Sequence, residues 1–411
     1  MIDLTSGGIF AAMLGDDSLE IRHAIRDHTM SGHPEFCSYS PHRSNYWRNR
    51  YISMLKELTG FTAVSLFSTG AEATEAFWRC CRVFSGKPGI WGGLIDPDEV
   101  GDAHPKSDSM HGVTLGSLIM AGKMSWQELG YFPELGENRF GRADTVTGGM
   151  IMEPYHAPSA QFHRIDPTIN RIASLQKEFP DIPLCLDEIQ GGFGRTGKLW
   201  AHQHYPDGLL KPDFITIGKL CGGGLPLSAL LGPKEIMESD SVKQFAHLHA
   251  THSGNPLMCA VGCTVIEEMQ KQRLIERSAK LGREMHEKLK ELPVRVHGKG
   301  LLAGIELTDN EEVKKVVGLS LKRGIQVCDT GRKWVKIGPA LNIEEGKLME
   351  GIKILMEVVG EVVHERKSTP YGPSCEEPEN SDSHLLPAGV QGDREGNNQG
   401  GEAPGSEGKY N

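Results

Sequence analysis

Short apolar runs alternate with longer amphipathic stretches along most of this 411-residue chain, and this alternation constrains the fold more than any other feature. Five runs are typical of buried strands: 64–67, 150–152, 184–186, 214–217 and 227–231. Four stretches are typical of helices: 71–84, 167–178, 256–270 and 274–292. Such alternation predicts an α/β fold, in which a mostly parallel sheet carries helices on both faces. Ligands bind beyond the carboxyl ends of the strands in sheets of this kind.

Charge and cysteine usage exclude several classes of function. The net charge of −10 provides no basic surface for a nucleic-acid backbone, so no direct nucleic-acid binding is expected. The first apolar stretch, 9–14, is too short for a membrane span or a signal-peptide core, and no basic residue precedes it. The nine cysteines form no CxxC pair. We therefore expect a cytoplasmic protein without membrane contact.

Four segments at expected strand ends contain residues that could carry chemistry. Residues 68–73 follow a strand and open a helix, where backbone N–H groups can bind an anion or merely cap the helix. Asp187 ends an apolar strand and needs a cationic partner, which a protonated heterocyclic nitrogen, a metal or a structural ion pair would supply. Lys219 ends another strand, where partial desolvation would suit imine formation, although a surface lysine is the simpler interpretation. Residues 251–256 form a turn into a helix, which is an ordinary cap by itself.

Taken together, the order and spacing of these segments resemble the class III aminotransferases, which are pyridoxal-phosphate enzymes of fold type I. The similarity extends from about residue 2 to 365. Its most specific part is the segment 186–198, Leu-Asp-Glu-Ile-Gln-Gly-Gly-Phe-Gly-Arg-Thr-Gly-Lys, followed by Lys-Pro-Asp at 211–213 and by 218–229. The resemblance implies a large domain with a seven-stranded type of sheet and a smaller α+β domain.

The resemblance also implies roles for individual residues. Lys219 would hold pyridoxal 5'-phosphate as a Schiff base and move the proton between the substrate and cofactor carbons. Asp187 would keep the pyridine nitrogen protonated, so that the ring acts as an electron sink. The other implied cofactor contacts are Gly70 and Ala71 at the phosphate, Met110, His111 and Ile189 at the ring, Gln190 near the phenolic oxygen, and Thr251 at the phosphate of the neighbouring subunit. Shared active sites of this kind require a homodimer.

The expected substrates are a small-molecule amine or amino acid as donor and a carbonyl compound as acceptor. The implied substrate contacts are Glu153, Tyr155 and Lys336. Many members of the family have an arginine where this chain has Lys336, and in several that arginine pairs with a glutamate where this chain has Pro158. Lysine cannot reproduce the bidentate grip of a guanidinium on a carboxylate. We therefore expect a non-standard substrate, although Lys336 could still direct its charge at a carboxylate.

Two further departures concern the loops. Met110 stands where the family places an aromatic residue that stacks on the ring, and a thioether can still contact the ring. The acidic stretch 96–108 before it resembles an inserted loop, in which His104 is either a substitute contact or a solvated residue. The N-terminal segment is shorter than in the family, which would open the site to a larger substrate, even an amine linked to a carrier.

The expected domain organisation combines these observations. Residues 1–45 form the shortened N-terminal part of the small domain, 46–262 the large cofactor-binding domain, 263–366 the C-terminal small domain, and 367–411 a disordered acidic tail.

Three alternatives to transamination remain at this point. The same fold and cofactor support decarboxylases, aminomutases and racemases. A non-catalytic relative would have lost the lysine or the aspartate, and this chain retains both Lys219 and Asp187. A metal site built from His202 and His204, or from His247, His249 and His252, lacks a supporting carboxylate or cysteine pattern.

Overall fold

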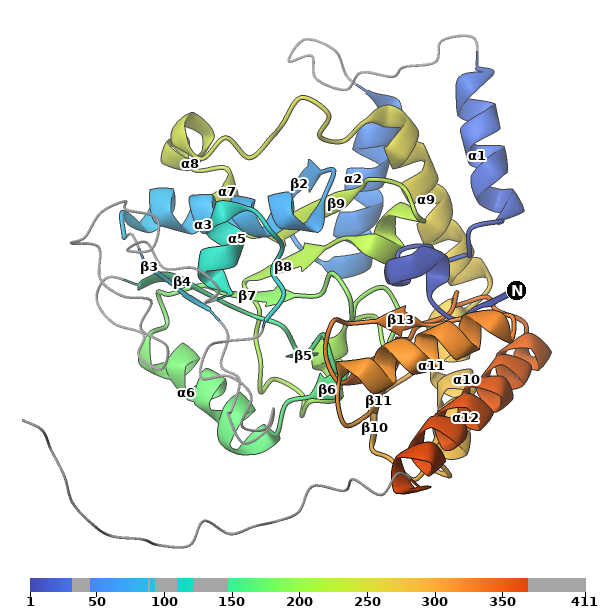
Figure 1. The fold of residues 1–411 in the computed structure, drawn as a ribbon. Coiled ribbons are helices and arrows are strands. Elements are labelled where there is room, and N and C mark those ends of the chain that lie inside the picture. The colour runs from blue at the N-terminus through green and yellow to red at the C-terminus, as the bar shows by residue number, and fades with distance from the viewer. Residues whose placement is uncertain (32–44, 88, 93–108, 122–146, 369–411) are drawn as a thin grey trace, which may run out of the picture. The chain divides into compact units, whose positions relative to one another are not determined.

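A six-stranded sheet in the order β2-β9-β8-β7-β4-β3 forms the centre of the computed structural model, which describes residues 1–31, 45–87, 89–92, 109–121 and 147–368 (Figure 1). Its strands are β2 (Ala63–Phe67), β3 (Gly89–Gly92), β4 (Thr147–Met152), β7 (Leu184–Asp187), β8 (Phe214–Ile217) and β9 (Ser228–Gly232). Only β9 runs antiparallel to its neighbours within this sheet. The predicted α/β class is therefore confirmed, and the described residues supply six strands of the expected seven-stranded type.

The four amphipathic stretches predicted as helices are helical, with ends that differ by a few residues: α3 (Gly70–Ser85), α6 (Asn170–Glu178), α9 (Pro256–Lys271) and α10 (Leu274–Leu289). The other helices are α1 (Leu19–Thr29), α2 (Tyr46–Thr59), α5 (Leu115–Met120), α7 (Lys234–Met237), α8 (Asp240–Phe245), α11 (Asn310–Lys322) and α12 (Glu345–Ser368). Short helical turns occupy Ser6–Phe10, Ile165–Ile169, Ala201–His204 and Lys219–Gly222. Across these described segments, no helix combines the length and apolar character needed to cross a bilayer.

The central strands are buried on both faces, as a sheet between two helical layers requires. Cys185 of β7 and Phe214 of β8 pack on one side in a cluster with Phe77 of α3. Their neighbours Leu186 and Ile215 point to the other side and join a core that includes α6 and α9. Burial on both faces explains why these strands are mostly apolar and do not alternate regularly between apolar and polar residues.

A second, antiparallel sheet has the order β10-β11-β14-β13, with β10 (Val296–Gly298), β11 (Ala303–Glu306), β13 (Cys328–Asp329) and β14 (Trp334–Ile337). Two short pairs complete the strands: β1 (Ile2–Asp3) beside β12 (Ile325–Gln326), and β5 (Tyr155–His156) beside β6 (Gln161–Phe162). Residues Met1–Ser368 form one compact unit. The domain limits at 45/46 and 262/263 stay predictions, and the predicted tail lies outside the described residues apart from its first two residues, which end α12.

The packing of α9 on α2 supports the turn that carries Lys219. Gly262 of α9 lies so close to α2 that an added Cβ would come within 2.7 Å of the Tyr51 ring. The Tyr51 hydroxyl in turn donates a hydrogen bond of 3.3 Å to the Cys221 carbonyl, two residues beyond Lys219. Figure 1 shows α9 running beside α1 and α2.

This close approach generates a stability prediction. We expect Gly262→Ala to lower the free energy of unfolding by about 1–3 kcal/mol, because the methyl group has no space. Gly360 of α12 meets no atom within 4 Å, so Gly360→Ala should instead raise the free energy of unfolding by roughly 0.5–1 kcal/mol. Urea denaturation of both variants and the wild type measures the two free energies of unfolding. If Gly262→Ala and Gly360→Ala change the free energy of unfolding equally, the packing argument is contradicted.

Candidate active site

The carboxyl ends of four parallel strands meet at one edge of the central sheet. β2, β4, β7 and β8 point the same way, since β2 and β8 are both antiparallel to β9 and the others pair in parallel. The residues that follow or end these strands are Gly70, Glu153, Asp187 and Lys219. The topology therefore brings together four positions that are far apart in sequence.

Asp187 is a buried carboxylate that is held by three donors. It is 4% exposed, and its Oδ2 lies 2.7 Å from Nδ1 of His111. Its Oδ1 accepts bonds of 3.2 Å from the Ile189 backbone N–H and from the Thr216 hydroxyl. Because an ionised carboxylate only accepts, His111 bears its proton on Nδ1. Within the described ranges Asp187 has no lysine or arginine ion-pair partner, so a cationic group at this edge would stabilise it.

His111 is itself held from two sides. Its carbonyl accepts a bond of 2.6 Å from the Thr74 hydroxyl of α3. The next residue, Gly112, has φ +113°, and an added Cβ there would come within 2.8 Å of Ala71 Cα. The loop that carries His111 can therefore lie directly on the first turn of α3. The Nε2 atom of His111 is buried and has no partner among the described residues.

Lys219 directs an unpaired amine toward this edge. It is half-buried, and its side chain makes no hydrogen bond within the part of the chain that the structure describes. Burial lowers its pKa below the ordinary value, and Asp187 and Glu153 oppose that shift. Its φ of +48° lies in the left-handed region, which costs a non-glycine residue about 1–2 kcal/mol. Strain of this kind at an unpaired, desolvated lysine is typical of a functional position.

Ile189 and two glycines form a narrow cradle between Asp187 and Lys219. A Cβ added to Gly70 would come within 2.7 Å of Ile189 Cδ1, and one added to Gly218 within 3.3 Å of Ile189 Cγ2. A flat ring can lie on Ile189 at this point only because both neighbours lack side chains. The buried Asp187, the unpaired lysine amine and this cradle fit the pyridoxal ring that the sequence predicts.

The first turn of α3 fits the phosphate group. Thr69 and Glu72 form a capping box, in which the Thr69 hydroxyl accepts from the Glu72 N–H at 3.2 Å and the Glu72 carboxylate accepts from the Thr69 N–H at 2.8 Å. The N–H groups of Gly70 and Ala71 are left without an acceptor among the described residues. Two free donors at the positive end of a 16-residue helix provide an anion site.

Glu153 lies at the end of β4, beside the same edge. It is 6% exposed, and its Oε2 accepts a bond of 3.0 Å from the Met110 N–H. Burial raises its pKa to about 7, an effect that His111 opposes and Asp187 reinforces. The side chain therefore exchanges a proton near neutral pH.

Tyr155, Gln190 and Lys336 form a connected group on the side of the second sheet. The Tyr155 hydroxyl donates a bond of 3.2 Å to Gln190 Oε1, and Lys336 Nζ donates to the same oxygen and to the Ala157 carbonyl. Lys336 is 2% exposed. Burial and, to a smaller extent, the nearby Lys219 together lower its pKa to about 7.

Two predicted site residues stand apart from this group. Met110 is 47% exposed and reaches Glu153 through its backbone. Thr251 is exposed on the turn before α9 and has no bond to the groups around Lys219 in the described part of this chain. The whole of the loop 96–108, including His104, lies outside the described residues.

Sequence reasoning missed several residues that complete the site. Thr74 and Thr216 hold His111 and Asp187, and Phe10 lies under the Lys336 ammonium with its ring centre 5.2 Å from Nζ. A hydroxyl on a helix or in a strand interior has no local signature. Only the position of Thr216, directly opposite Asp187 in the register of β7 and β8, could have indicated its role.

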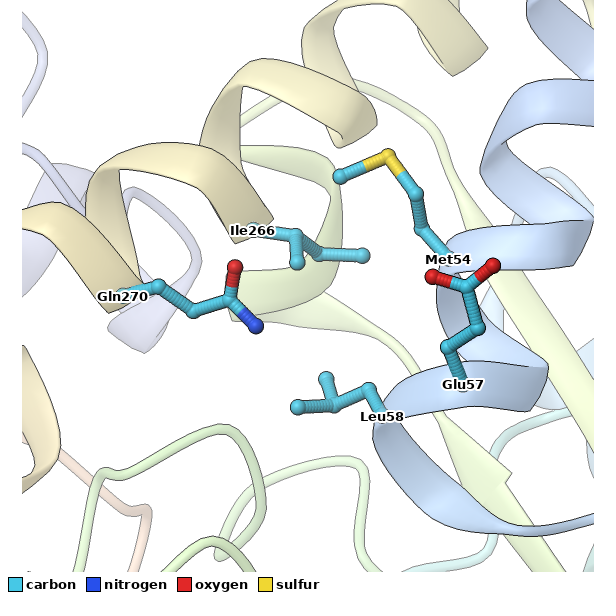
Figure 2. A pocket seen from close by; sticks show the side chains of 5 residues that line it. All are labelled: Met54, Glu57, Leu58, Ile266 and Gln270. Carbon is cyan, nitrogen blue, oxygen red and sulfur yellow. The ribbon is translucent and has the colours of Figure 1, made fainter.

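A surface pocket of about 250 Å³ lies away from these residues, between α2 and α9. Figure 2 shows its lining: Met54, Glu57, Leu58, Ile266 and Gln270. None of the residues predicted to hold the cofactor contributes to it. The site is therefore identified by the convergence of side chains at the sheet edge.

The raised pKa of Glu153 generates a prediction about stability and pH. Because folding favours its protonated form, this group increasingly lowers stability as pH rises from the ordinary value of 4.5 to about 7. We expect Glu153→Gln to raise the free energy of unfolding of the cofactor-free protein by up to roughly 3 kcal/mol at pH 8, and by much less at pH 5. Urea denaturation at the two pH values measures the difference.

Glu306 is the matched control. Burial alone would raise its pKa, but the bonds from Lys333 and His297 hold it below the ordinary value. Glu306→Gln should therefore lower stability at pH 8, which is the opposite sign. If Glu153→Gln lowers stability equally at both pH values, the proton on Glu153 is not the cause.

Comparison with known proteins identifies the family. The family model described as Aminotransferase class-III matches residues 133–359, more than half of the chain. An acetylornithine aminotransferase of Aquifex aeolicus is 31% identical over 263 residues, which cover 61% of this chain and 67% of that protein. A leucine/methionine racemase of Thermococcus litoralis is 37% identical over 195 residues, which cover 44% of this chain and 43% of that protein.

The solved structures extend the likeness to the fold. An ornithine aminotransferase from Toxoplasma gondii, whose structure is described with partial occupancy of pyridoxal phosphate at its active site, aligns with a TM-score of 0.69 at 22% identity. The alignment covers 89% of this chain and 87% of that one. The unpaired lysine, the buried aspartate and the helix N-terminus thus occur in a chain with the matching sequence pattern and fold. This chain belongs to the class III aminotransferases, which are pyridoxal-phosphate-dependent enzymes of fold type I.

Proposed function

We propose that this aminotransferase holds its cofactor through a Schiff-base linkage to Lys219 and transfers an amino group between an amine or amino-acid donor and a carbonyl acceptor. The observation that carries the proposal is the meeting of an unpaired lysine amine, a buried carboxylate and two free helix N–H groups around Ile189. When bound, pyridoxal phosphate supplies a ring that stabilises negative charge on the substrate carbon.

Several side chains of this chain have separate roles in the proposed reaction. Asp187 would keep a proton on the ring nitrogen, and His111 and Thr216 hold the carboxylate in place. The Nζ atom of Lys219 would take a proton from the donor carbon and deliver it to the cofactor carbon, and its lowered pKa favours the neutral amine that this transfer needs. Glu153 and Tyr155 border the substrate side.

Thr251 supports the proposal of a homodimer with shared sites. It is exposed in the single chain, whereas Gly70 and Ala71 of the same chain supply only two donors for a phosphate group. A hydroxyl from a second subunit would add a further donor. We therefore propose that Thr251 completes the phosphate site of the neighbouring subunit.

The substrate and the cellular location are proposed on narrower grounds. Acetylornithine aminotransferases are among the relatives, but Lys336 is bonded to protein groups and is not presented for an incoming carboxylate. This favours a donor other than the relatives' substrate. The cysteines in the described ranges are free thiols, which supports the reducing cytoplasm expected from the sequence.

The covalent linkage is tested by Lys219→Ala. We expect the purified wild type to show a visible absorption band from the cofactor, which borohydride reduction fixes to the chain, and Lys219→Ala to show no such attachment. With a donor, the wild type should form pyridoxamine phosphate and a carbonyl product, and the variant should lose at least about a thousandfold in turnover. Mass spectrometry of protein and products measures both.

Lys347→Ala is the control, since Lys347 lies on the exposed surface of α12 with Glu344 as its partner. It should retain attachment and turnover. An active Lys219→Ala enzyme would contradict the assignment of Lys219. A racemised or decarboxylated donor, with the cofactor unchanged, would contradict transamination.

The shared site is tested by mixing two variants, each impaired at a different residue. Lys219→Ala retains Thr251, and a Thr251→Ala chain retains Lys219. If Thr251 serves the other subunit, a mixed dimer contains one intact site, so co-refolding equal amounts should restore about a quarter of wild-type activity. Activity that stays at the level of the separate variants, in a mixture confirmed as mixed dimers, would show that Thr251 acts within its own chain.

A further inference from the structure

Lys336 occupies a position from which its side chain can reach the predicted cofactor site. It lies in β14, paired with Gly304 of β11 on one side and with Cys328 of β13 on the other. Its side chain is almost completely buried, at 2% exposure. Removing an ammonium group from water is costly unless its protons have acceptors.

Protein groups surround the ammonium of Lys336. It donates to the Ala157 carbonyl and to Gln190 Oε1, and the centre of the Phe10 ring lies 5.2 Å from Nζ. It has no carboxylate partner within the described residues. Two of its three N–H donors therefore already have acceptors in the protein, and one of those acceptors is a backbone carbonyl.

Gly304 makes the contact with Ala157 possible. A Cβ on Gly304 would overlap the Ser159 carbonyl, so the turn between β5 and β6 can lie on the second sheet only at a glycine. This turn contains Pro158, and the carbonyl that precedes it is the acceptor for Lys336. A backbone carbonyl cannot swing away as a carboxylate can.

The second contact determines how the Gln190 amide is oriented. An ammonium group can only donate, so the amide atom that faces it must be the oxygen. The Tyr155 hydroxyl also donates to this oxygen, at 3.2 Å. Both donors hold Oε1 on the side of the second sheet, and Nε2 of the half-buried Gln190 has no partner among the described residues.

We propose that Lys336 is a positioning residue, which together with Tyr155 holds Gln190 so that its Nε2 donates to the phenolic oxygen of the cofactor. The proposal rests on the proposed function, because it needs pyridoxal phosphate bound at Lys219. Lys336 thereby acts on the cofactor through Gln190 and does not bind the carboxylate of the substrate.

A double-mutant cycle on the substrate-free holoenzyme tests the proposal. The variants are Lys336→Met, Gln190→Met and the pair together. The readouts are the dissociation constant for pyridoxal phosphate and the pH midpoint of its visible absorption band. A donor at the phenolic oxygen stabilises its negative charge, so losing that donor should raise the midpoint and weaken cofactor binding by about threefold to tenfold.

The expected result is that both single variants shift the two readouts in the same direction, and that the pair shifts them no further than Gln190→Met alone. Lys333→Met removes a lysine that pairs with Glu306 beside the same strand, and should leave both readouts unchanged. If Lys336→Met is not recovered folded, Tyr155→Phe removes the other donor to Oε1 and should give a smaller shift that Gln190→Met abolishes.

Two outcomes would overturn the proposal. Additive shifts would show that Lys336 acts on the cofactor without Gln190. An unchanged spectrum, with KM raised for amino acids but not for the matching simple amines, would show that Lys336 binds the substrate carboxylate. A wild-type protein that binds no pyridoxal phosphate would overturn the proposed function itself, and the inference with it.

Discussion

The buried carboxylate of Asp187 is the constraint on which the rest of the site depends. A charge at 4% exposure must be offset by hydrogen bonds, and here each donor comes from a different part of the chain. His111 belongs to the segment after residue 108, Thr216 to β8, and the Ile189 N–H to the turn after β7. The hydrogen bonds of Asp187 therefore form only when the strands have this order and the segment that carries His111 lies beside them. In the proposed function, the cationic ring nitrogen of the cofactor would add the positive partner that these donors do not supply.

Missing side chains matter as much at this edge as those that are present. Gly70 and Gly218 lie against Ile189, and Gly112 lies against Ala71, so that an added methyl group would come within 2.7, 3.3 and 2.5 Å of these neighbours, respectively. The close approach brings the first turn of α3, the lysine turn and the histidine segment around one space. Lys219 accepts a left-handed backbone there, so the position of its amine depends on strain that the surrounding packing must hold.

The sequence predicts the layered sheet well, because strand ends and helix starts are local properties. The run 184–186 is apolar throughout, and it is followed directly by Asp187, which the topology brings to the edge. Contacts that depend on register could not be predicted in this way. The hydrogen bond from Thr74 to His111 and the close approach of Gly304 to the Ser159 carbonyl join segments that are far apart in sequence. No local sequence pattern predicts that these segments meet.

Lys336 differs from an arginine paired with a carboxylate mainly in how its hydrogen-bond partners are held. An arginine and a carboxylate can separate and re-form, because each also makes good bonds with other ions or water. A lysine bonded to the Ala157 carbonyl and Gln190 has partners that are fixed by the backbone and by Tyr155. With its pKa lowered to about 7, it can lose a proton and still donate two hydrogen bonds. In its ammonium form Lys336 can only donate, which is why the oxygen of the Gln190 amide faces it.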